Sequence, residues 1–289
     1  MTFVSVIIAT IVFCVAAPVI GCILAGLDRI ITARMQGRVG PPVLQPYYDV
    51  RKLIEKDDVS VNGLDGMYMS VALVFTMFAG GIFFSGGNVL MSAFIITMAA
   101  LFFIIAAYSS RSPYAELGAN RECLQVMSYE PMVLFFAVAF YLAAGTFNSA
   151  GVFGLDAPVI TKLVLVYIGF LFILTIKLRK SPFDLSYSHH AHQELVKGVT
   201  TEMSGKTLAK VEVMHWCESV LFLGWTGLFF VYGGPLGLAL GVIAALIAWF
   251  LEIWIDNNFA RVKWQVMLKW AWIVALVCGG VNIAVLMLV

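Results

Sequence analysis

Eight long runs of apolar residues dominate this chain and leave few folds open to it. A helix that spans a bilayer needs about 20 apolar residues, with a range of roughly 17–25. Because backbone polar groups inside lipid must be paired within the segment, such runs favour helices. We therefore predict an all-α integral membrane protein of about eight transmembrane helices, forming a single polytopic membrane domain over residues 1–289. The spans are expected near residues 3–27, 68–84, 89–108, 132–147, 159–176, 211–232, 235–255 and 270–289.

The first run is expected to stay in the protein as a span. Residues 3–27 are too many for the apolar core of a signal peptide, and neither a basic leader nor a small-residue cleavage site accompanies them. Two pairs of runs are separated by turn residues, at 85–88 and at 233–235, which predicts tight helical hairpins.

The composition excludes several classes of function. Only 12% of the residues are charged, about half the share in soluble domains. The formal net charge of +1 provides no basic surface for nucleic acid. The cysteines are scattered and form no C-x-x-C pair, so we expect no disulfide framework, metal site or iron–sulfur cluster in this chain. They are Cys14, Cys22, Cys123, Cys217 and Cys278.

Basic residues are placed unevenly along the chain. Of the 18 Lys and Arg residues, all but Lys162 fall in or beside the connections after spans one, three, five and seven. By the positive-inside rule these connections face the cytoplasm, so both termini face outward from the cell's inner (cytoplasmic) membrane. Two of these cytoplasmic connections, 28–67 and 177–210, are long enough to carry function.

The first long connection has features of a docking surface. A basic segment with rigid turns, residues 33–42, is followed by a stretch over 44–56 whose apolar residues recur at helical spacing, which predicts an interfacial amphipathic helix. Contact with lipid phosphates and docking of a partner subunit both fit this pattern. The candidate docking residues are Arg34, Gln36, Arg38, Asp49 and Arg51.

Ionisable residues also occur at span mouths and in the second long connection. Glu130 directly precedes Pro131 at the mouth of span four, where it is either a helix cap or a buried proton site. In the second long connection, the spacing of the histidines and Glu194 matches no standard zinc signature. A proton relay, a pH-sensitive contact and a structural role remain open for the three histidines. They are His189, His190 and His192.

Span six is polar for a membrane helix. Glu212, His215 and Glu218 follow one another at three-residue intervals, on neighbouring helix faces. Ionisable groups within a membrane are costly and point to function, and Glu218 and His215 lie deeper than Glu212. Near the end of span seven, an interfacial position is favoured for Glu252.

Five short motifs together carry a family resemblance. All fall on cytoplasmic connections or span mouths, and their order is part of the signal. They are Ala33-Arg34-Met35-Gln36 with Arg38, Gly40 and Pro41; Leu44-Gln45-Pro46 with Asp49, Lys52 and Leu53; Ser128-Tyr129-Glu130; Pro182-Phe183-Asp184-Leu185; and Glu194-Leu195-Val196 with Gly198, Glu202, Ser204 and Gly205. In these motifs the chain resembles the NuoH family, the membrane subunit that respiratory complex I shares with membrane-bound hydrogenases. The B subunit of the energy-converting [NiFe] hydrogenase Ech is the branch it resembles most.

The resemblance implies a function for the chain. It would anchor a hydrogenase module and couple ferredoxin-linked H+ reduction or H2 oxidation to proton or sodium translocation. The partners implied are a [NiFe] large subunit, iron–sulfur small subunits and an antiporter-like membrane subunit, with the [NiFe] centre and clusters on those partners and no catalytic centre or cofactor here. A protonatable path would pass through Glu130, Glu194, Glu202, Glu218 and Asp184, and His215 joins it as the neighbour of Glu218.

Other functions remain open. Respiratory members of the family have an acidic run before Glu194, where this chain has Ser-His-His-Ala-His-Gln over residues 188–193, so a quinone-site role is the alternative. A stand-alone secondary transporter with Glu218 as its proton site is another, although the chain lacks the matched broken helices of inverted repeats. The third is a passive anchor, in which the carboxylates only cap helices and satisfy loops. The formate- and carbon-monoxide-linked relatives also remain possible.

Overall fold

The chain folds into a bundle of long helices. The computed structural model describes residues 3–57, 63–180, 182–186 and 195–288, and this part contains helices and turns with isolated β-bridges but no strand. The α-helices are α1 (Phe3–Met35), α2 (Gln45–Glu55), α3 (Leu64–Phe84), α4 (Val89–Ser109), α5 (Pro113–Ala144), α6 (Val164–Lys177), α7 (Gly205–Leu228), α8 (Pro235–Asn258), α9 (Trp264–Val274) and α10 (Val281–Leu288). Short 3-10 turns, η1 (Ser149–Gly154), η2 (Val159–Thr161) and η3 (Gly198–Thr200), interrupt the connections, and a π-helical turn, η4 (Ala275–Gly280), joins α9 to α10.

Six helical segments are long and apolar enough to cross a bilayer within the described residues: α1, α3, α4, α5, α8 and the continuous α9–η4–α10. The predicted fifth span corresponds to α6, an apolar helix of only 14 residues. The sixth corresponds to α7, in which Glu212, His215 and Glu218 reduce the apolar character. The all-α membrane fold is confirmed, while the count of eight spans stays a prediction.

Helix α5 begins far earlier than the sequence predicts. The predicted span started at Met132, but the helix runs for 32 residues from Pro113. Ser112 and Pro113 supply the start, because proline at the first helical position has no backbone N–H to leave unpaired. The stretch expected to be a connection is therefore helical, and Glu122 and Glu130 lie on one helix.

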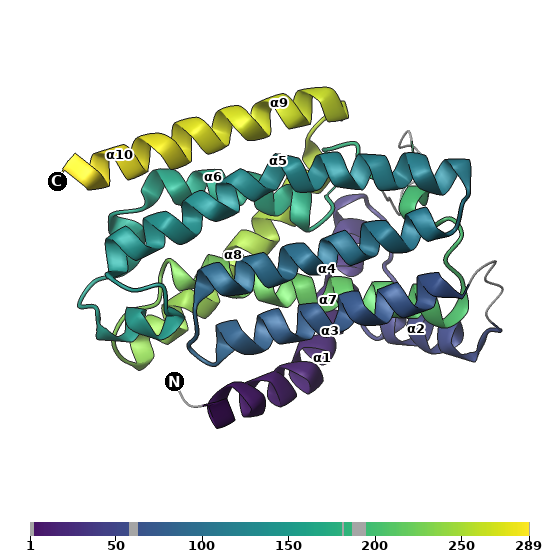
Figure 1. Ribbon diagram of the computed structural model, residues 1–289, viewed down its shortest axis with the longest axis horizontal. Helices are drawn as coiled ribbons and strands as arrows, with labels where there is room; N and C mark the ends of the chain where they lie inside the picture. Colours follow the sequence, from purple (N-terminus) through teal and green to yellow (C-terminus); the bar gives the residue numbers. More distant parts are fainter. Residues whose placement is uncertain (1–2, 58–62, 181, 187–194, 289) are drawn as a thin grey trace.

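The long helices alternate in direction, and both chain ends lie at the same end of the bundle (Figure 1). At the opposite end α1, α4, α6 and α8 finish, whereas α3, α5, α7 and α9 begin; we call this the polar end. Helix α2 lies there against α1 and α7 and buries Pro46 and Val50, so the predicted amphipathic helix forms. In the apolar interior, Phe136 packs against Phe170, Phe229 and Trp225.

One close approach fixes the second long connection on the bundle. A Cβ atom at Gly118 of α5 would collide with the backbone of Gly198 and Val199, so only glycine lets η3 lie this close. The hydroxyl of Tyr114, one turn earlier on α5, accepts a hydrogen bond from the Val196 N–H at 3.1 Å. These contacts hold the segment before α7 against the start of α5.

Candidate functional site

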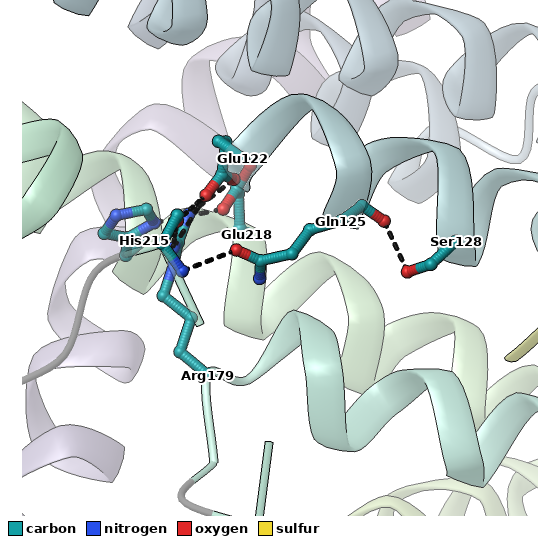
Figure 2. Close-up of polar contacts among 7 residues, drawn as sticks. Glu122, Gln125, Ser128, Arg179, His215 and Glu218 are labelled. Carbon is teal, nitrogen blue, oxygen red and sulfur yellow. Dashed lines mark hydrogen bonds and ion pairs between the residues drawn. The ribbon is translucent and has the colours of Figure 1, made fainter. Parts of the chain in front are cut away.

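A bidentate ion pair lies at the centre of the polar end. Arg179, which follows α6, donates to both carboxylate oxygens of Glu122 on α5, at 2.9 and 3.2 Å. Both side chains are largely buried, at 15% and 6% exposure. Figure 2 shows the Arg179 guanidinium directed at Glu122, with Glu218 and His215 beside them. Such fork-to-fork pairing is among the strongest charge-assisted contacts in proteins.

The segment 182–186 folds back over α5 and completes this pair. The Ser186 hydroxyl donates to Glu122, and the Ser186 N–H donates to Gln125 Oε1 at 2.8 Å. Asp184 pairs with Arg121 at 3.3 Å, and its N–H donates to Val262 O at 3.2 Å. The predicted site residue Asp184 thus lies beside the Glu122 pair, one helical turn away along α5.

A second pair lies on α7. His215 Nδ1 and Glu218 Oε2 are 3.1 Å apart, and the Glu218 side chain is 9% exposed. The His215 ring lies edge-on to Phe103 of α4, with ring centroids 5.8 Å apart. The helical spacing noted in the sequence therefore produces a direct contact, and two of the predicted residues meet.

A buried ammonium group connects the two pairs. Lys177, the last residue of α6, lies 3.7 Å from the ring centroid of Tyr129 and 4.8 Å from that of Phe222. It is also within electrostatic reach of Glu122, Glu130 and Glu218. Aromatic faces attract cations without taking their charge, so Lys177 can respond to all three carboxylates.

Two cavities adjoin this group of residues, which we call the central cluster (Glu122, Gln125, Lys177, Arg179, Ser186, His215 and Glu218). A cavity of about 10 Å³ is lined by Glu122, Gln125, Lys177, Arg179 and Glu218, and it has room for about one water molecule. A larger cavity of about 240 Å³ lies among α1, α7 and α8. Arg179 lines both cavities, while His215 lines the larger one and contacts Glu218 in the smaller.

The other predicted path residues are more dispersed. Glu130 is half-buried on α5 and hydrogen-bonds to the Thr97 hydroxyl of α4 at 2.8 Å. Glu202 lies in the turn between η3 and α7 and is partly exposed. Glu194 and the three histidines at 189, 190 and 192 lie outside the described residues. No group of three His, Cys, Asp or Glu residues is placed to hold a metal ion in the part of the chain that the structure describes.

The candidate docking residues line the loop between α1 and α2 and the outer face of α2. Arg34, Gln36 and Arg38 are exposed, and Arg38 contacts Gln36, which donates to Asn257 of α8 at 3.1 Å. Asp49 accepts hydrogen bonds from Arg29 at 2.6 Å and from Gln45 at 2.9 Å. The structure therefore uses Asp49 within the chain.

Arg51 differs from these residues because it points to solvent. It pairs with Glu55 at 2.9 Å across one helical turn, and this hydrogen bond raises the pKa of the guanidinium. The cation therefore stays charged at any physiological pH and is available to an acidic partner.

Comparison with known proteins decides the family. A family model described as NADH dehydrogenase matches residues 7–287. The chain belongs to the NADH dehydrogenase family. One relative, hydrogenase-4 component C of Escherichia coli (strain K12), is 26% identical over 275 residues and covers 86% of each protein. Another, a membrane-complex protein of Rickettsia canadensis (strain McKiel) named as part of NADH-quinone oxidoreductase, is 30% identical over 257 residues, which are 80% of this chain and 75% of the relative.

A solved structure supports the fold. A chain of the membrane-bound sulfane sulfur reductase, an archaeal respiratory membrane complex, superposes with a TM-score of 0.85 at 22% sequence identity. The match covers 97% of this chain and 99% of that one. The bundle is therefore the fold of this NADH dehydrogenase family member, and the family resemblance drawn from the motifs is confirmed.

Sequence reasoning missed half of the central cluster in this NADH dehydrogenase family member. Arg179 and Lys177 were counted only as positive charges on a cytoplasmic connection, and Glu122 was assigned to a loop. Glu122 and Arg179 are 57 residues apart, so no local spacing shows their contact. Ser112 and Pro113 were the available signal, because a helix starting there places Glu122 and Glu130 eight residues apart on one helix.

Proposed function

We propose that this chain is the membrane subunit of an energy-converting [NiFe] hydrogenase complex. It would anchor the soluble hydrogenase module and couple ferredoxin-linked H+ reduction or H2 oxidation to proton translocation. Membership of the NADH dehydrogenase family and the relative named hydrogenase-4 component C support this assignment. The observation that carries it is the meeting of two buried carboxylates and three basic side chains around a cavity of one water.

The charge balance of the central cluster suits coupling. Glu122 is matched by Arg179, whereas Lys177 faces Glu122, Glu130 and Glu218 without a fixed ion pair to any of them in the part of the chain described. One proton can therefore be added to or removed from the group without breaking the Glu122–Arg179 fork. The His215 Nδ1–Glu218 Oε2 contact gives that proton two positions 3.1 Å apart.

An electrostatic trigger is physically sufficient. In a low-dielectric site the charge on a docked redox partner alters the proton affinity of nearby carboxylates. Moving one charge against 100 mV needs about 2.3 kcal/mol, and a pKa change of one unit is worth about 1.36 kcal/mol. A change of roughly two units drives the step, which lies within the range known for buried groups.

The redox groups would belong to the partner subunits. The [NiFe] centre would exchange electrons with protons or H2, and the clusters would pass them to ferredoxin. In this chain, Arg34, Arg38 and Arg51 would hold the soluble module, while Glu130, Glu194, Glu202 and Asp184 would extend the path from the loops to Glu218.

A second candidate function is a quinone-site role in a complex I-type enzyme. The relative with 30% identity is part of an NADH-quinone oxidoreductase, which favours this alternative. The two functions differ in their partner subunits, because one requires a nickel-binding subunit and the other an NADH-binding subunit. A stand-alone transporter would have neither partner.

Purification of the tagged chain from its native membrane tests the assignment. We expect nickel, iron and acid-labile sulfide to co-purify, together with a subunit of hydrogenase type. Co-purification of an NADH-binding flavin subunit without nickel would establish the quinone alternative, and isolation of the chain alone would leave the transporter.

The coupling role is tested in proteoliposomes with the Glu218→Gln variant. We expect proton uptake per H2 oxidised to fall at least about tenfold, while dye-linked H2 oxidation persists because the nickel chemistry lies elsewhere. Glu55→Gln is the matched control, since Glu55 is an exposed carboxylate on α2. Unchanged proton uptake in an intact Glu218→Gln complex would leave the chain as a passive anchor, and uptake that requires sodium would identify Na+ as the ion.

A further inference from the structure

A fully buried carboxyl group lies outside the central cluster. The Glu252 side chain on α8 has 0% exposure. Among the described residues, neither of its oxygens accepts a hydrogen bond of ordinary geometry. Thr175 of α6 lies beside it, but its hydroxyl lies 3.3 Å from Leu171 O and bonds there. The sequence favoured an interfacial position for this residue, and the structure instead encloses it between helices.

The charged group that faces Glu252 is Lys180, and it is already shared. Its ammonium donates to Asp28 at 2.5 Å and lies 3.8 Å from Asp256. The titratable groups within electrostatic reach of Glu252 are Lys180 after α6, Asp256 on α8 itself and Tyr167 on α6. A second full negative charge on α8 would therefore have to compete for one cation.

Water can approach Glu252 from the polar end. Asp28, Lys180 and Asp256 line the cavity of about 240 Å³ among α1, α7 and α8. Asp256 is four residues after Glu252, so the two carboxyl groups lie on the same face of α8, one turn apart. The cavity thus reaches within one helical turn of the buried group.

An ionised carboxylate without donors is expensive in such a place. The effective cost of burying an unpaired charge is several kcal/mol, and ionisable groups inside membrane proteins point to function by default. Binding a proton removes this cost without any further ligand, whereas a metal cation needs several oxygen ligands around it. The surroundings of Glu252 therefore favour a proton over sodium.

We propose that Glu252 is a second proton-binding site, held as a neutral carboxylic acid at neutral pH and exchanging its proton with the cavity through Asp256. In this exchange the O–H bond of Glu252 breaks, the proton passes to a carboxylate oxygen of Asp256 or to water, and Glu252 becomes a carboxylate beside Lys180. The site does not depend on the hydrogenase assignment, because it uses none of the central cluster.

Infrared difference spectroscopy of the purified complex at pH 7 tests the proposal. A protonated carboxyl group has a C=O stretching band separate from those of carboxylates and amides, and the band shifts in D2O. The wild-type spectrum minus that of Glu252→Gln should contain this band. Glu55→Gln is the matched control and should leave the band in place, because Glu55 is exposed and ion-paired. Equal bands in the wild type and in Glu252→Gln would overturn the proposal.

Two further measurements keep the test decisive. If Glu252→Gln prevents assembly, Glu252→Asp retains an acid and should give the band at a shifted frequency; an unshifted band would also overturn the assignment. Asp256→Asn should slow the D2O shift of the band at least about tenfold, and an unchanged rate would refute the route through Asp256. Loss of the wild-type band on adding NaCl at constant pH and ionic strength would show sodium binding and contradict the choice of a proton.

Discussion

The Glu122–Arg179 fork is predicted to be the most strongly coupled ion pair in the described part of the chain. Both side chains are less than one-fifth exposed, and two hydrogen bonds of 2.9 and 3.2 Å join them. Glu122→Gln would leave the guanidinium buried with the Ser186 hydroxyl at 3.5 Å and the Phe103 ring as its remaining contacts. Removing one partner of a buried pair typically costs about 3–5 kcal/mol.

A double-mutant cycle separates this pair from the general effect of mutation. Glu122→Gln and Arg179→Gln should each destabilise the chain by about 3 kcal/mol or more, because each leaves a buried charge unmatched. The double variant leaves no unmatched charge, so it should be less destabilised than the sum by about 2 kcal/mol. The free energy of unfolding is measured by denaturant titration in detergent micelles, with tryptophan fluorescence as the signal.

The exposed pair Arg51–Glu55 is the matched control for the cycle. It has a similar distance of 2.9 Å, but both side chains are about two-thirds exposed, so water screens it and its coupling should be too small to detect. If the buried pair gives additive single and double variants, like the exposed one, burial does not strengthen the Glu122–Arg179 fork and the electrostatic reasoning is wrong.

Arg38→Glu should release the soluble redox subunits, because it reverses an exposed charge on the predicted docking loop; retention of those subunits at unchanged affinity, measured by pull-down, contradicts the docking role. Tyr129→Leu should destabilise the chain by about 2 kcal/mol more than Tyr129→Phe, since only the ring attracts the desolvated Lys177 ammonium; equal unfolding free energies would exclude the cation–π contact. A tag fused after residue 289 should react with an impermeant reagent in intact cells, because the basic connections lie at the opposite end of the bundle from the termini; reaction only after lysis would reverse the topology.

The apolar helices were predictable because lipid selects composition directly. The expected spans at 89–108 and 235–255 differ by at most three residues at either end from α4 and α8. Composition marks an apolar run but not where its helix begins, and so the run 159–176 contains both η2 and the shorter α6. The start of α5 was missed for the opposite reason, since Glu116, Arg121 and Glu122 lower its hydropathy although the residues are helical.

The candidate site was predictable where its contacts are local. His215 and Glu218 lie three residues apart on one helix, and their contact follows from helical geometry. The partners of Glu122 and Glu130 come from α4, α6 and the segment 182–186, and these contacts depend on how the helices pack. The burial of Glu252 depends likewise on the packing of α6 against α8, so its interfacial assignment was wrong.

The turn after α6 sends two neighbouring cations to two different sites. Arg179 adopts a φ of +54°, a conformation that costs a residue other than glycine of order 1–3 kcal/mol and persists only where the surroundings enforce it. Arg179 binds Glu122 in the central cluster, while Lys180 binds Asp28 and faces Glu252. The chain then continues into 182–186 and the connection predicted to face the soluble subunits. A displacement of this one turn would therefore change the charge balance at both buried carboxyl sites together, which a change within a single span cannot do.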